Sequence, residues 1–295
     1  MAASHRDKRR RGFTLVETSV VLVIIGLIVG GILVGLDLVH GAEVRATISQ
    51  MQKYQAAVHT FQNEYGFLPG DIPDPYASQF GFRARGTARG QGDGNGIIEQ
   101  WNCCLGLGGA NGEQLMFWVD LSTAGLIDGG FSTATSTVAP GSSATGAILN
   151  QYLPQAKIGG GNYVYVFSGG WGDNAGTSSS TNGINYYGIS AAYTLGAGCN
   201  CLYSNPGLTV QQAYAIDSKI DDGNPLTGNV LAAYISSNNW IWRGFPDNTP
   251  PPTSALGGSS TTCYDNGNNS NNPMQYSTKQ NGGSGVNCGL TFQFQ

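Results

Sequence analysis

The most prominent pattern in the chain is an apolar run near the N-terminus, at residues 13–36, which reads FTLVETSVVLVIIGLIVGGILVGL. Its single charged residue is Glu17, and residues 18–36 carry no charge. A helix of this length spans roughly 36 Å, enough to cross a hydrocarbon core of about 30 Å. A secretory signal peptide has a shorter apolar region, which ends in small residues before its cleavage site. This run is longer, and no such cleavage site follows it cleanly. The run therefore predicts a membrane-anchoring helix.

The apolar pattern continues beyond this span as a helical stripe. Spacings of three and four residues connect its members, and polar side chains occupy the opposite face. Gly66, followed by Pro69, is well placed to end the helix. We therefore expect one helix over about 14–65, whose second half lays the stripe against a core. The stripe consists of Val44, Ile48, Met51, Tyr54, Val58, Phe61 and Tyr65.

Beyond residue 66 the pattern predicts short helices and strands. One helix is expected over 111–124 and another over 209–220, where Thr209 and Gln212 form a capping box. β-Branched and aromatic runs bounded by Gly and Asn predict strands. These strands are expected over 163–167, 186–195, 230–235, 239–245 and 290–294.

Long polar stretches separate these elements. Loops are expected over 129–147, 169–183 and 246–285. The last contains three consecutive prolines and a run of Gly, Asn and Ser, so it is expected to be a flexible surface loop outside the core. The part of the chain after residue 66 is thus predicted to be α+β, loop-rich and mainly antiparallel.

Composition and charge narrow the classes of protein. The 295 residues include 45 glycines and only 11% charged residues, unlike a coiled coil or a helical bundle. Five of the 14 basic residues lie in the first 12 positions, so from Phe13 onward 9 Lys and Arg stand against 17 Asp and Glu, a net charge of −8. An acidic body with so few cations has no electrostatic surface for nucleic acid. The basic end should remain cytoplasmic, which places the rest outside the inner membrane.

The N-terminal region combines several features in a fixed order: a basic leader, Gly12, Phe13, a short apolar stretch, Glu17 and an uninterrupted hydrophobic helix. This order resembles the prepilin cleavage and methylation motif of type IV pilins and type II secretion pseudopilins, over about residues 6–65. The resemblance implies that a membrane-embedded prepilin peptidase cuts after Gly12, and that Phe13 becomes an N-methylated N-terminus. It also implies that Glu17 pairs with the N-terminal amine of a neighbouring subunit, which neutralises a carboxylate that is costly inside a membrane.

Two features of the span admit another interpretation. On physical grounds alone, Glu17 can also lie near the cytoplasmic end of the span and snorkel to the interface. Many members of the resembled family carry a proline partway along the membrane helix, and this chain has none there. It has Gly26, Gly30, Gly31 and Gly35 instead. These glycines either soften the helix by roughly 1 kcal/mol each or provide small-residue packing sites for neighbouring helices.

The chain has an even number of cysteines, all in the part expected outside the inner membrane, where the compartment is oxidising. We expect three disulfides, for which six cysteines allow 15 pairings. Cysteines that are close neighbours in sequence should bond to different partners. The alternative is a zinc site, although the spacing is not the usual pair with two intervening residues. The six are Cys103, Cys104, Cys199, Cys201, Cys263 and Cys288.

Two acidic stretches are candidates for Ca²⁺ binding. The first offers Asp93, Asn95 and Glu99 as oxygen ligands, in a partial match to an EF-hand loop. The alternative for each stretch is an Asx-type turn rich in Asp, Asn and Gly. The resemblance adds some weight to calcium, because major pseudopilins commonly carry a calcium-bound loop, and no other cofactor is expected. The second stretch offers Asp217, Asp221 and Asp222.

Catalytic constellations are missing from the sequence beyond residue 66. The three histidines are His5, His40 and His59, so neither a Ser-His-Asp nor a Cys-His centre can form among the later residues. The glycine-rich runs lack the Lys-Ser/Thr ending of a P-loop and do not follow a strand and open a helix. A membrane-anchored enzyme is therefore disfavoured.

The expected organisation is a leader at 1–12, a transmembrane and stem helix at 13–65, and an extracytoplasmic head at 66–295. The fold class is α+β, with the second half of the long helix packed against a loop-rich, mainly antiparallel β-sheet. We expect a single span in the inner membrane, with the N-terminus cytoplasmic and the head periplasmic.

The resemblance implies a structural, non-enzymatic subunit of a type IV pilus or a type II secretion pseudopilus, which passes from the membrane into a filament at the cell surface. The implied partners are other pilin subunits, the prepilin peptidase and the inner membrane, with no nucleic acid. The large head favours a minor or specialised subunit. The alternative is a tip-located adhesin whose head binds a surface, a glycan or a secretion substrate.

Overall fold

A computed structural model describes most of the chain. The described residues are 14–100, 111–138, 140, 144–172, 179–197, 201–234, 262–267, 269 and 271–295. The chain divides into two compact units, Met1–Ala42 and Glu43–Gln295. Within the described residues, the fold is a mixture of helices and antiparallel strands, which confirms the predicted α+β class.

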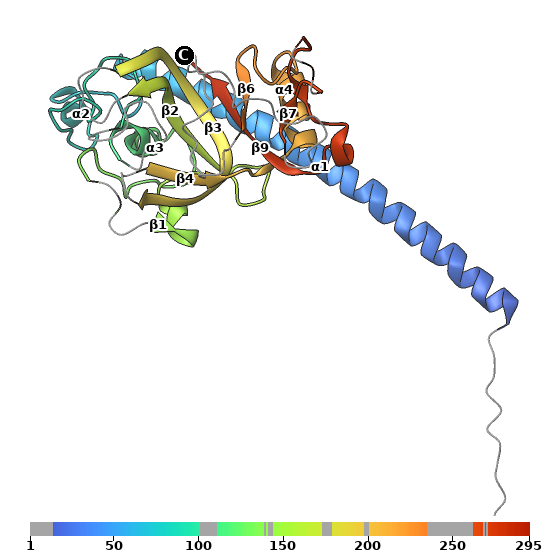
Figure 1. The fold of residues 1–295 in the computed structure, drawn as a ribbon. Helices are drawn as coiled ribbons and strands as arrows, with labels where there is room; N and C mark the ends of the chain where they lie inside the picture. Colours follow the sequence, from blue (N-terminus) through green and yellow to red (C-terminus); the bar gives the residue numbers. More distant parts are fainter. Residues whose placement is uncertain are drawn as a thin grey trace, which may run out of the picture. The chain divides into compact units, whose positions relative to one another are not determined.

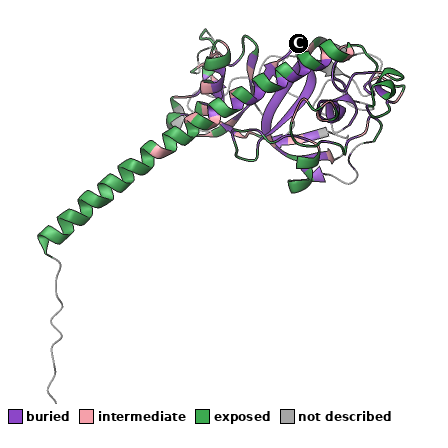
Figure 2. Ribbon diagram, turned by 180° about the vertical axis from the view of Figure 1, so that it is seen from behind, coloured by how far each residue is buried: buried purple, intermediate pink, exposed green. Residues whose placement is uncertain are grey.

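Helix α1 is a single helix, Leu15–Tyr65, as the apolar pattern predicts. It ends at Gly66, whose φ of 78° lies in the left-handed region that glycine adopts without strain. Residues in the first part of the helix are exposed almost throughout, as the colouring in Figure 2 shows, and the first buried residue of the described helix is Val44. The unit that contains the sheet begins at Glu43, so it includes the second half of α1.

The predicted stripe on the second half of α1 is buried. Five of its members are less than 9% exposed, and Ile48 and Tyr65 are partly buried against the same core. Tyr54 lies at the centre of this contact, with its ring 5.1 Å from Trp118 and 6.2 Å from Tyr187. The stripe therefore packs against both a second helix and a strand. The five are Val44, Met51, Tyr54, Val58 and Phe61.

Three shorter helices belong to the second unit: α2 (Tyr76–Gln79), α3 (Glu113–Thr123) and α4 (Val210–Ile220). The last two lie where the sequence predicts them. Thr209 and Gln212 form the expected capping box of α4, each side chain accepting a hydrogen bond from the other residue's backbone N–H at 3.1 and 3.0 Å. Short 3₁₀ turns η1 (Gly146–Gln151) and η2 (Gln280–Gly283) complete the helical elements of the described part.

Strand β3 (Ser179–Ala197) organises a seven-stranded sheet in which every pairing is antiparallel. It pairs with β1, β2, β4 and β9, and β9 also pairs with β5 and β6. Figure 1 shows β2, β3 and β9 as neighbouring arrows in this sheet. The other strands are β1 (Ala144–Thr145), β2 (Tyr163–Gly172), β4 (Cys201–Asn205), β5 (Leu208–Thr209), β6 (Val230–Tyr234) and β9 (Val286–Gln293).

Two of the predicted loops are wrong in part. The range 169–183 contains strand, because β2 continues to Gly172 and β3 starts at Ser179, with Gly172 opposite Ser179. The small and polar residues there pair through their backbones and give no alternating apolar signal. Likewise, the range 129–147 contains β1 and the start of η1. The strand predicted at 239–245 lies outside the described residues.

The prediction that 246–285 is a loop outside the core is wrong for its described part. That part holds β7 (Tyr264–Asp265) paired with β8 (Gln275–Tyr276). Tyr264 and Tyr276 are buried, at 4% and 7% exposure, and Cys263 is fully buried. The polar composition concealed this because a disulfide and a buried hydrogen bond, rather than an apolar run, attach the segment to its neighbours.

Candidate functional site

The start of helix α1 carries a reciprocal capping arrangement between Thr14 and Glu17. The Thr14 backbone N–H and hydroxyl both donate to Oε2 of Glu17, at 2.7 and 2.9 Å, and the Glu17 N–H donates to the Thr14 hydroxyl at 3.2 Å. This is a capping box, in which the two residues satisfy donors that a helix terminus leaves unpaired. The Thr-x-x-Glu spacing is the sequence signal for this capping box. It was missed because the stretch was interpreted only as part of a membrane span.

The second oxygen of Glu17 remains available. Every hydrogen bond of the described residues to this carboxylate goes to Oε2, and none goes to Oε1. The two ion pairs found within the described ranges both lie in the second unit and do not involve Glu17. Gly12 and Phe13, the predicted cleavage and methylation residues, lie outside the described residues. The carboxylate can therefore accept a further donor without giving up its capping bonds.

Helix α1 is also long and apolar enough to cross a membrane, by length and composition. None of its most apolar window is buried, and large side chains such as Leu22, Leu27 and Leu33 are between 59% and 72% exposed. An apolar surface of this extent is unfavourable in water and marks a region that contacts lipid or another protein.

A comparison with known protein families finds a match to the N-terminal region. Residues 7–33 match the family described as the prokaryotic N-terminal methylation motif. The chain therefore carries the N-terminal signature of type IV pilins and pseudopilins, as the order of Gly12, Phe13 and Glu17 predicts. Neither the curated proteins nor the solved structures include a match to the chain.

In the second unit, three carboxylates converge around the start of α3. Oxygens of Asp71, Asp93 and Glu113 lie within 4.8 Å of one another, and Asp71 and Glu113 are almost fully buried. The sequence did not identify this set, because Asp71 and Glu113 are separated from Asp93 by about 20 residues on either side and belong to no local motif.

Backbone N–H groups surround the two buried members of this cluster. Asp71 accepts hydrogen bonds from the N–H groups of Gly94 and Gly96, at 2.8 and 2.7 Å. Glu113 accepts from Gly92 with one oxygen and from Glu99 with the other, both at 2.8 Å. These bonds fold the 92–99 loop around the cluster and satisfy part of each carboxylate's acceptor capacity.

The predicted calcium ligands Asp93, Asn95 and Glu99 lie together in the structure, and each also makes contacts of its own. Glu99 is fully buried and forms an ion pair with Arg89, whose Nε donates at 2.6 Å. Asp93 and Asn95 form Asx-type turns, with Asp93 accepting from the Asn95 N–H at 3.2 Å and Asn95 from the Ile97 N–H at 2.8 Å. The Asn95 side-chain amide also donates to Asp93 Oδ2 at 3.2 Å and to Glu99 Oε2 at 3.5 Å. Asp93 lies in addition with Asp71 and Glu113.

Burial and mutual repulsion shift the protonation of this cluster. Burial raises the pKa of Asp71 to about 7, although hydrogen bonds from Gly96 and Gly94 oppose the shift. Burial, followed by the charge of Asp71, raises the pKa of Glu113 well above its usual range. Nearby Arg89 is engaged with Glu99, and Arg85 is engaged with Asp120. The folded state therefore retains protons here that the unfolded chain releases at lower pH.

We expect the stability of the second unit to fall as pH rises from about 4 through 7. The pKa of Asp71 is higher in the folded state than in the unfolded state. The stabilisation is therefore complete below the unfolded-state pKa of 3.8 and is lost as pH rises through the folded-state pKa of about 7. The slope is at most about 1.4 kcal/mol per pH unit for one group. Thermal unfolding in EGTA between pH 5 and 8 measures it.

The matched variants for this pH series are Asp71→Asn, which should reduce the slope while Glu113 and Asp217 still contribute to it, and Asp128→Asn, which changes an exposed carboxylate and should leave the slope unchanged. A melting temperature that is level or increases with pH in the unmodified protein would contradict the assignment of the bound protons to this cluster.

The second predicted acidic set does converge. Asp217, Asp221 and Asp222 present oxygens within 4.8 Å of one another. Asp217 accepts from the Tyr276 hydroxyl at 2.7 Å and from the Gly223 N–H at 3.1 Å. Burial raises the pKa of Asp217 to about 6, and the Tyr276 hydrogen bond opposes this shift. The set thus ends α4 and shapes the loop that follows it.

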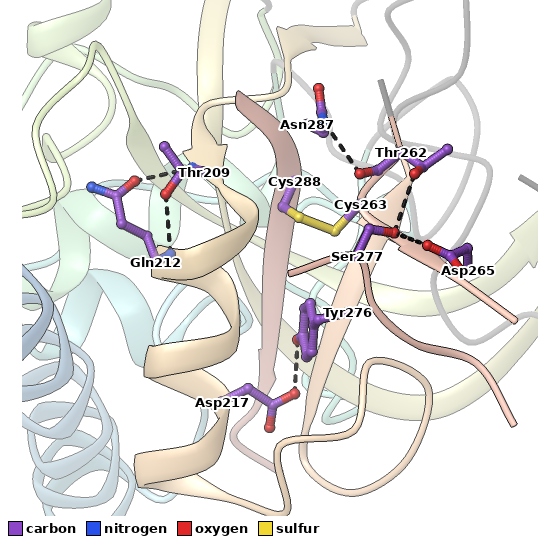
Figure 3. The surroundings of a disulfide bond; sticks show 10 residues. All are labelled: Thr209, Gln212, Asp217, Thr262, Cys263, Asp265, Tyr276, Ser277, Asn287 and Cys288. Atoms are coloured by element: carbon purple, nitrogen blue, oxygen red, sulfur yellow. Dashed lines mark hydrogen bonds between the residues drawn. A yellow bond between two sulfur atoms is a disulfide. The ribbon is translucent and has the colours of Figure 1, made fainter. Parts of the chain in front are cut away.

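One disulfide is formed between two of the three described cysteines. Cys263 and Cys288 are bonded, with Cα atoms 5.1 Å apart and both residues fully buried. Figure 3 shows the bond between β9 and the segment that leads into β7. Cys201 begins β4, whereas Cys103, Cys104 and Cys199 lie outside the described residues. For this pair, the disulfide replaces the alternative of zinc ligation.

Removing the disulfide should release the C-terminal segment. We expect Cys263→Ala/Cys288→Ala to lower the free energy of unfolding by roughly 2–4 kcal/mol, because the bond closes a long loop in the unfolded chain. The first new sites of limited proteolysis should fall within 262–285. Unchanged stability and an unchanged proteolysis pattern would show that side-chain packing alone holds this segment.

Proposed function

We propose that this protein is a structural, pilin-like subunit that assembles through its N-terminal helix into a type IV pilus or a type II secretion pseudopilus. The observation that carries the proposal is the methylation motif at 7–33, which leads directly into an unbroken helix with an exposed apolar first half. Packing such helices together in a filament would cover the apolar surface.

In this proposal, the prepilin peptidase cuts between Gly12 and Phe13 and the new N-terminus at Phe13 is methylated. Before assembly, α1 anchors the subunit in the inner membrane with its basic end in the cytoplasm and its head in the periplasm. The mature subunit then joins a filament at the cell surface.

Glu17 is proposed as the assembly contact. Its Oε2 caps its own helix through Thr14, and its Oε1 is free of hydrogen bonds from the described residues. A neighbouring subunit's N-terminal amine, placed against Oε1, would neutralise the charge while the capping bonds persist. The carboxylate then has two functions, helix capping within a subunit and recognition between subunits.

A minor or specialised role fits the size and construction of the second unit, which spans Glu43–Gln295 and carries a seven-stranded sheet with an additional disulfide-linked hairpin. No catalytic role is proposed, since the histidines lie only at positions 5, 40 and 59. The alternative, a binding subunit at the filament tip, is favoured by one observation, a pocket beside that hairpin.

Copy number in purified filaments tests the minor role. Filaments sheared from cells should contain this subunit at a small fraction of the dominant pilin, measured by quantitative mass spectrometry. A stoichiometry equal to that of the main building block would contradict the minor role, and complete absence from filaments and pseudopili would contradict the filament role.

Calcium binding by an acidic set remains a prediction. Carboxylates are the donor type that Ca²⁺ prefers. The ligands predicted from the sequence are Asp93, Asn95 and Glu99 or Asp217, Asp221 and Asp222, and the structure adds Asp71 and Glu113 beside Asp93 as a first set of three carboxylates. If calcium at pH 7.5 raises the melting temperature above its value in EGTA, and Asp71→Asn abolishes this increase, the ion is bound by the first set. A melting temperature equal to that in EGTA would exclude a stabilising calcium ion.

A further inference from the structure

A pocket lies between the loop after α4 and the β8 hairpin, two segments about 50 residues apart in sequence. Its volume is about 310 Å³, at the lower end of the roughly 300–1,000 Å³ range of small-molecule sites. The walls of the pocket are uncharged, because none of the lining side chains carries a charge. The lining residues are Tyr214, Gly223, Asn224, Pro225, Pro273, Met274, Gln275, Tyr276 and Thr278.

The first wall is held in place by the acidic end of α4. Asp217 accepts from the Gly223 N–H at 3.1 Å, and Asp222 accepts from the Asn224 N–H at 2.8 Å. The carbonyl of Pro225 accepts from the Ala232 N–H at 2.8 Å, which ties the loop to β6. Asp217 and Asp222 thus hold this wall through its backbone N–H groups, and neither carboxylate is among the lining residues, which are uncharged.

The second wall is equally fixed. The disulfide attaches its base to β9, and Ser277 donates from its backbone to the carbonyl of Cys263 at 3.0 Å. The Ser277 hydroxyl contacts Asp265 at 2.5 Å and Thr262 at 3.1 Å. Figure 3 shows this network together with the Tyr276–Asp217 hydrogen bond of 2.7 Å, which connects the two walls. The pocket is therefore preformed, as small-molecule sites usually are.

Tyr214 gives the pocket its recognition surface. It is 43% exposed, whereas its neighbour Tyr276 is 7% exposed, and their rings are 5.8 Å apart in an edge arrangement. The pocket thus combines an accessible aromatic ring with the amide and hydroxyl groups of Asn224, Gln275 and Thr278. An aromatic face binds apolar C–H surface, and uncharged amides and hydroxyls both donate and accept hydrogen bonds.

We propose that this pocket binds a neutral saccharide unit, with Tyr214 stacked on the apolar face of the sugar ring. A pyranose ring presents a C–H face on one side and hydroxyl groups around its edge, which is the combination that these walls complement. A phosphate or a carboxylate finds no positive charge among the lining residues. The proposal goes beyond filament assembly and does not depend on processing or polymerisation.

A proline-rich peptide is the main competing ligand, since such peptides dock in aromatic grooves. That mode needs an extended groove with successive aromatic residues, whereas the lining of this pocket includes one tyrosine that is exposed to a substantial degree. The observations therefore favour a compact ligand with many hydroxyls.

The test uses the full-length protein in a detergent without a sugar headgroup. Saturation-transfer NMR is recorded with methyl glycosides of glucose, galactose, mannose, N-acetylglucosamine and N-acetylgalactosamine, and calorimetry then measures the strongest binder. We expect Tyr214→Ala to weaken binding by roughly tenfold or more through loss of the stacked ring. Tyr214→Phe should retain most of the affinity.

Tyr193→Ala is the matched control, because Tyr193 is 39% exposed on β3 and does not line the pocket. Its binding and the melting temperature of both alanine variants should equal those of the unmodified protein. Failure of every glycoside to bind would overturn the proposal. Sugar binding that is unchanged in Tyr214→Ala would also overturn the proposal. A third contrary result would be a polyproline decapeptide that binds through Tyr214 while no sugar binds. None of these outcomes would affect the filament role.

Discussion

Glu17→Ala is expected to remove the subunit from filaments while leaving its precursor inserted in the membrane. The substitution makes the span more apolar, so insertion should be unaffected or improved. It also removes the only carboxylate in the run at 13–36 that can neutralise an incoming N-terminal amine. Immunoblots of membrane and sheared-filament fractions, normalised to a membrane marker, measure the two effects separately.

Two further variants distinguish assembly from helix capping. Thr14→Ala removes the hydroxyl that caps the helix but keeps the charge of Glu17, so it should cost about 1 kcal/mol of local helix stability and reduce incorporation less than Glu17→Ala. Asp37→Ala removes another exposed carboxylate of α1 and should assemble normally. Equal defects in Thr14→Ala and Glu17→Ala would mean that capping, rather than recognition between subunits, is what assembly requires.

Arg85→Met is expected to destabilise the second unit by roughly 3–5 kcal/mol, because it leaves a buried carboxylate without its counter-charge. Arg85 and Asp120 have fully buried side chains, and Nη2 lies 2.5 Å from Oδ2. The same oxygen also accepts from the Gly70 N–H at 2.6 Å. Burial raises the pKa of Asp120 and the Arg85 charge opposes this shift, so losing Arg85 favours protonation. Denaturant unfolding followed by tryptophan fluorescence measures the loss.

Arg83→Met is the matched control for this measurement. Arg83 is exposed and, among the described residues, its side chain donates to the carbonyls of Ala134 and Ser132, so its removal should cost far less than that of Arg85. The double variant Arg85→Met/Asp120→Leu should recover much of the lost stability, because neither charge then remains buried. Equal losses in the two single variants would contradict the importance of the buried pair.

Features of the fold that depend on local sequence were predictable. Helix α1 ends at Gly66, and α4 begins with the capping box of Thr209 and Gln212, because each signal lies within a few residues of the element it controls. The extension of β2 to Gly172 was not predictable, because glycine and serine pair through their backbones without an apolar alternation. Local patterns specify where elements begin and end, whereas strand pairing depends on distant partners.

The same division applies to the candidate sites. The methylation motif was predicted from the order of residues around Gly12, Phe13 and Glu17, and residues 7–33 match it. The role of Glu17 as the assembly contact stays a prediction. The buried cluster of Asp71 with Glu113 was not identified, because tertiary folding brings these residues together. The pocket between Tyr214 and Tyr276 depends in addition on a disulfide whose pairing the six cysteines alone could not determine.

The central claim is that this chain is processed as a prepilin, and mass spectrometry of its N-terminus tests this claim most directly. The protein is isolated from cells with and without the prepilin peptidase and digested for identification of the N-terminal peptide. We predict a peptide that begins with N-methylated Phe13 in the first case and retains residues 1–12 in the second. A mature chain from peptidase-positive cells that retains the leader, or begins anywhere other than Phe13, would contradict the account.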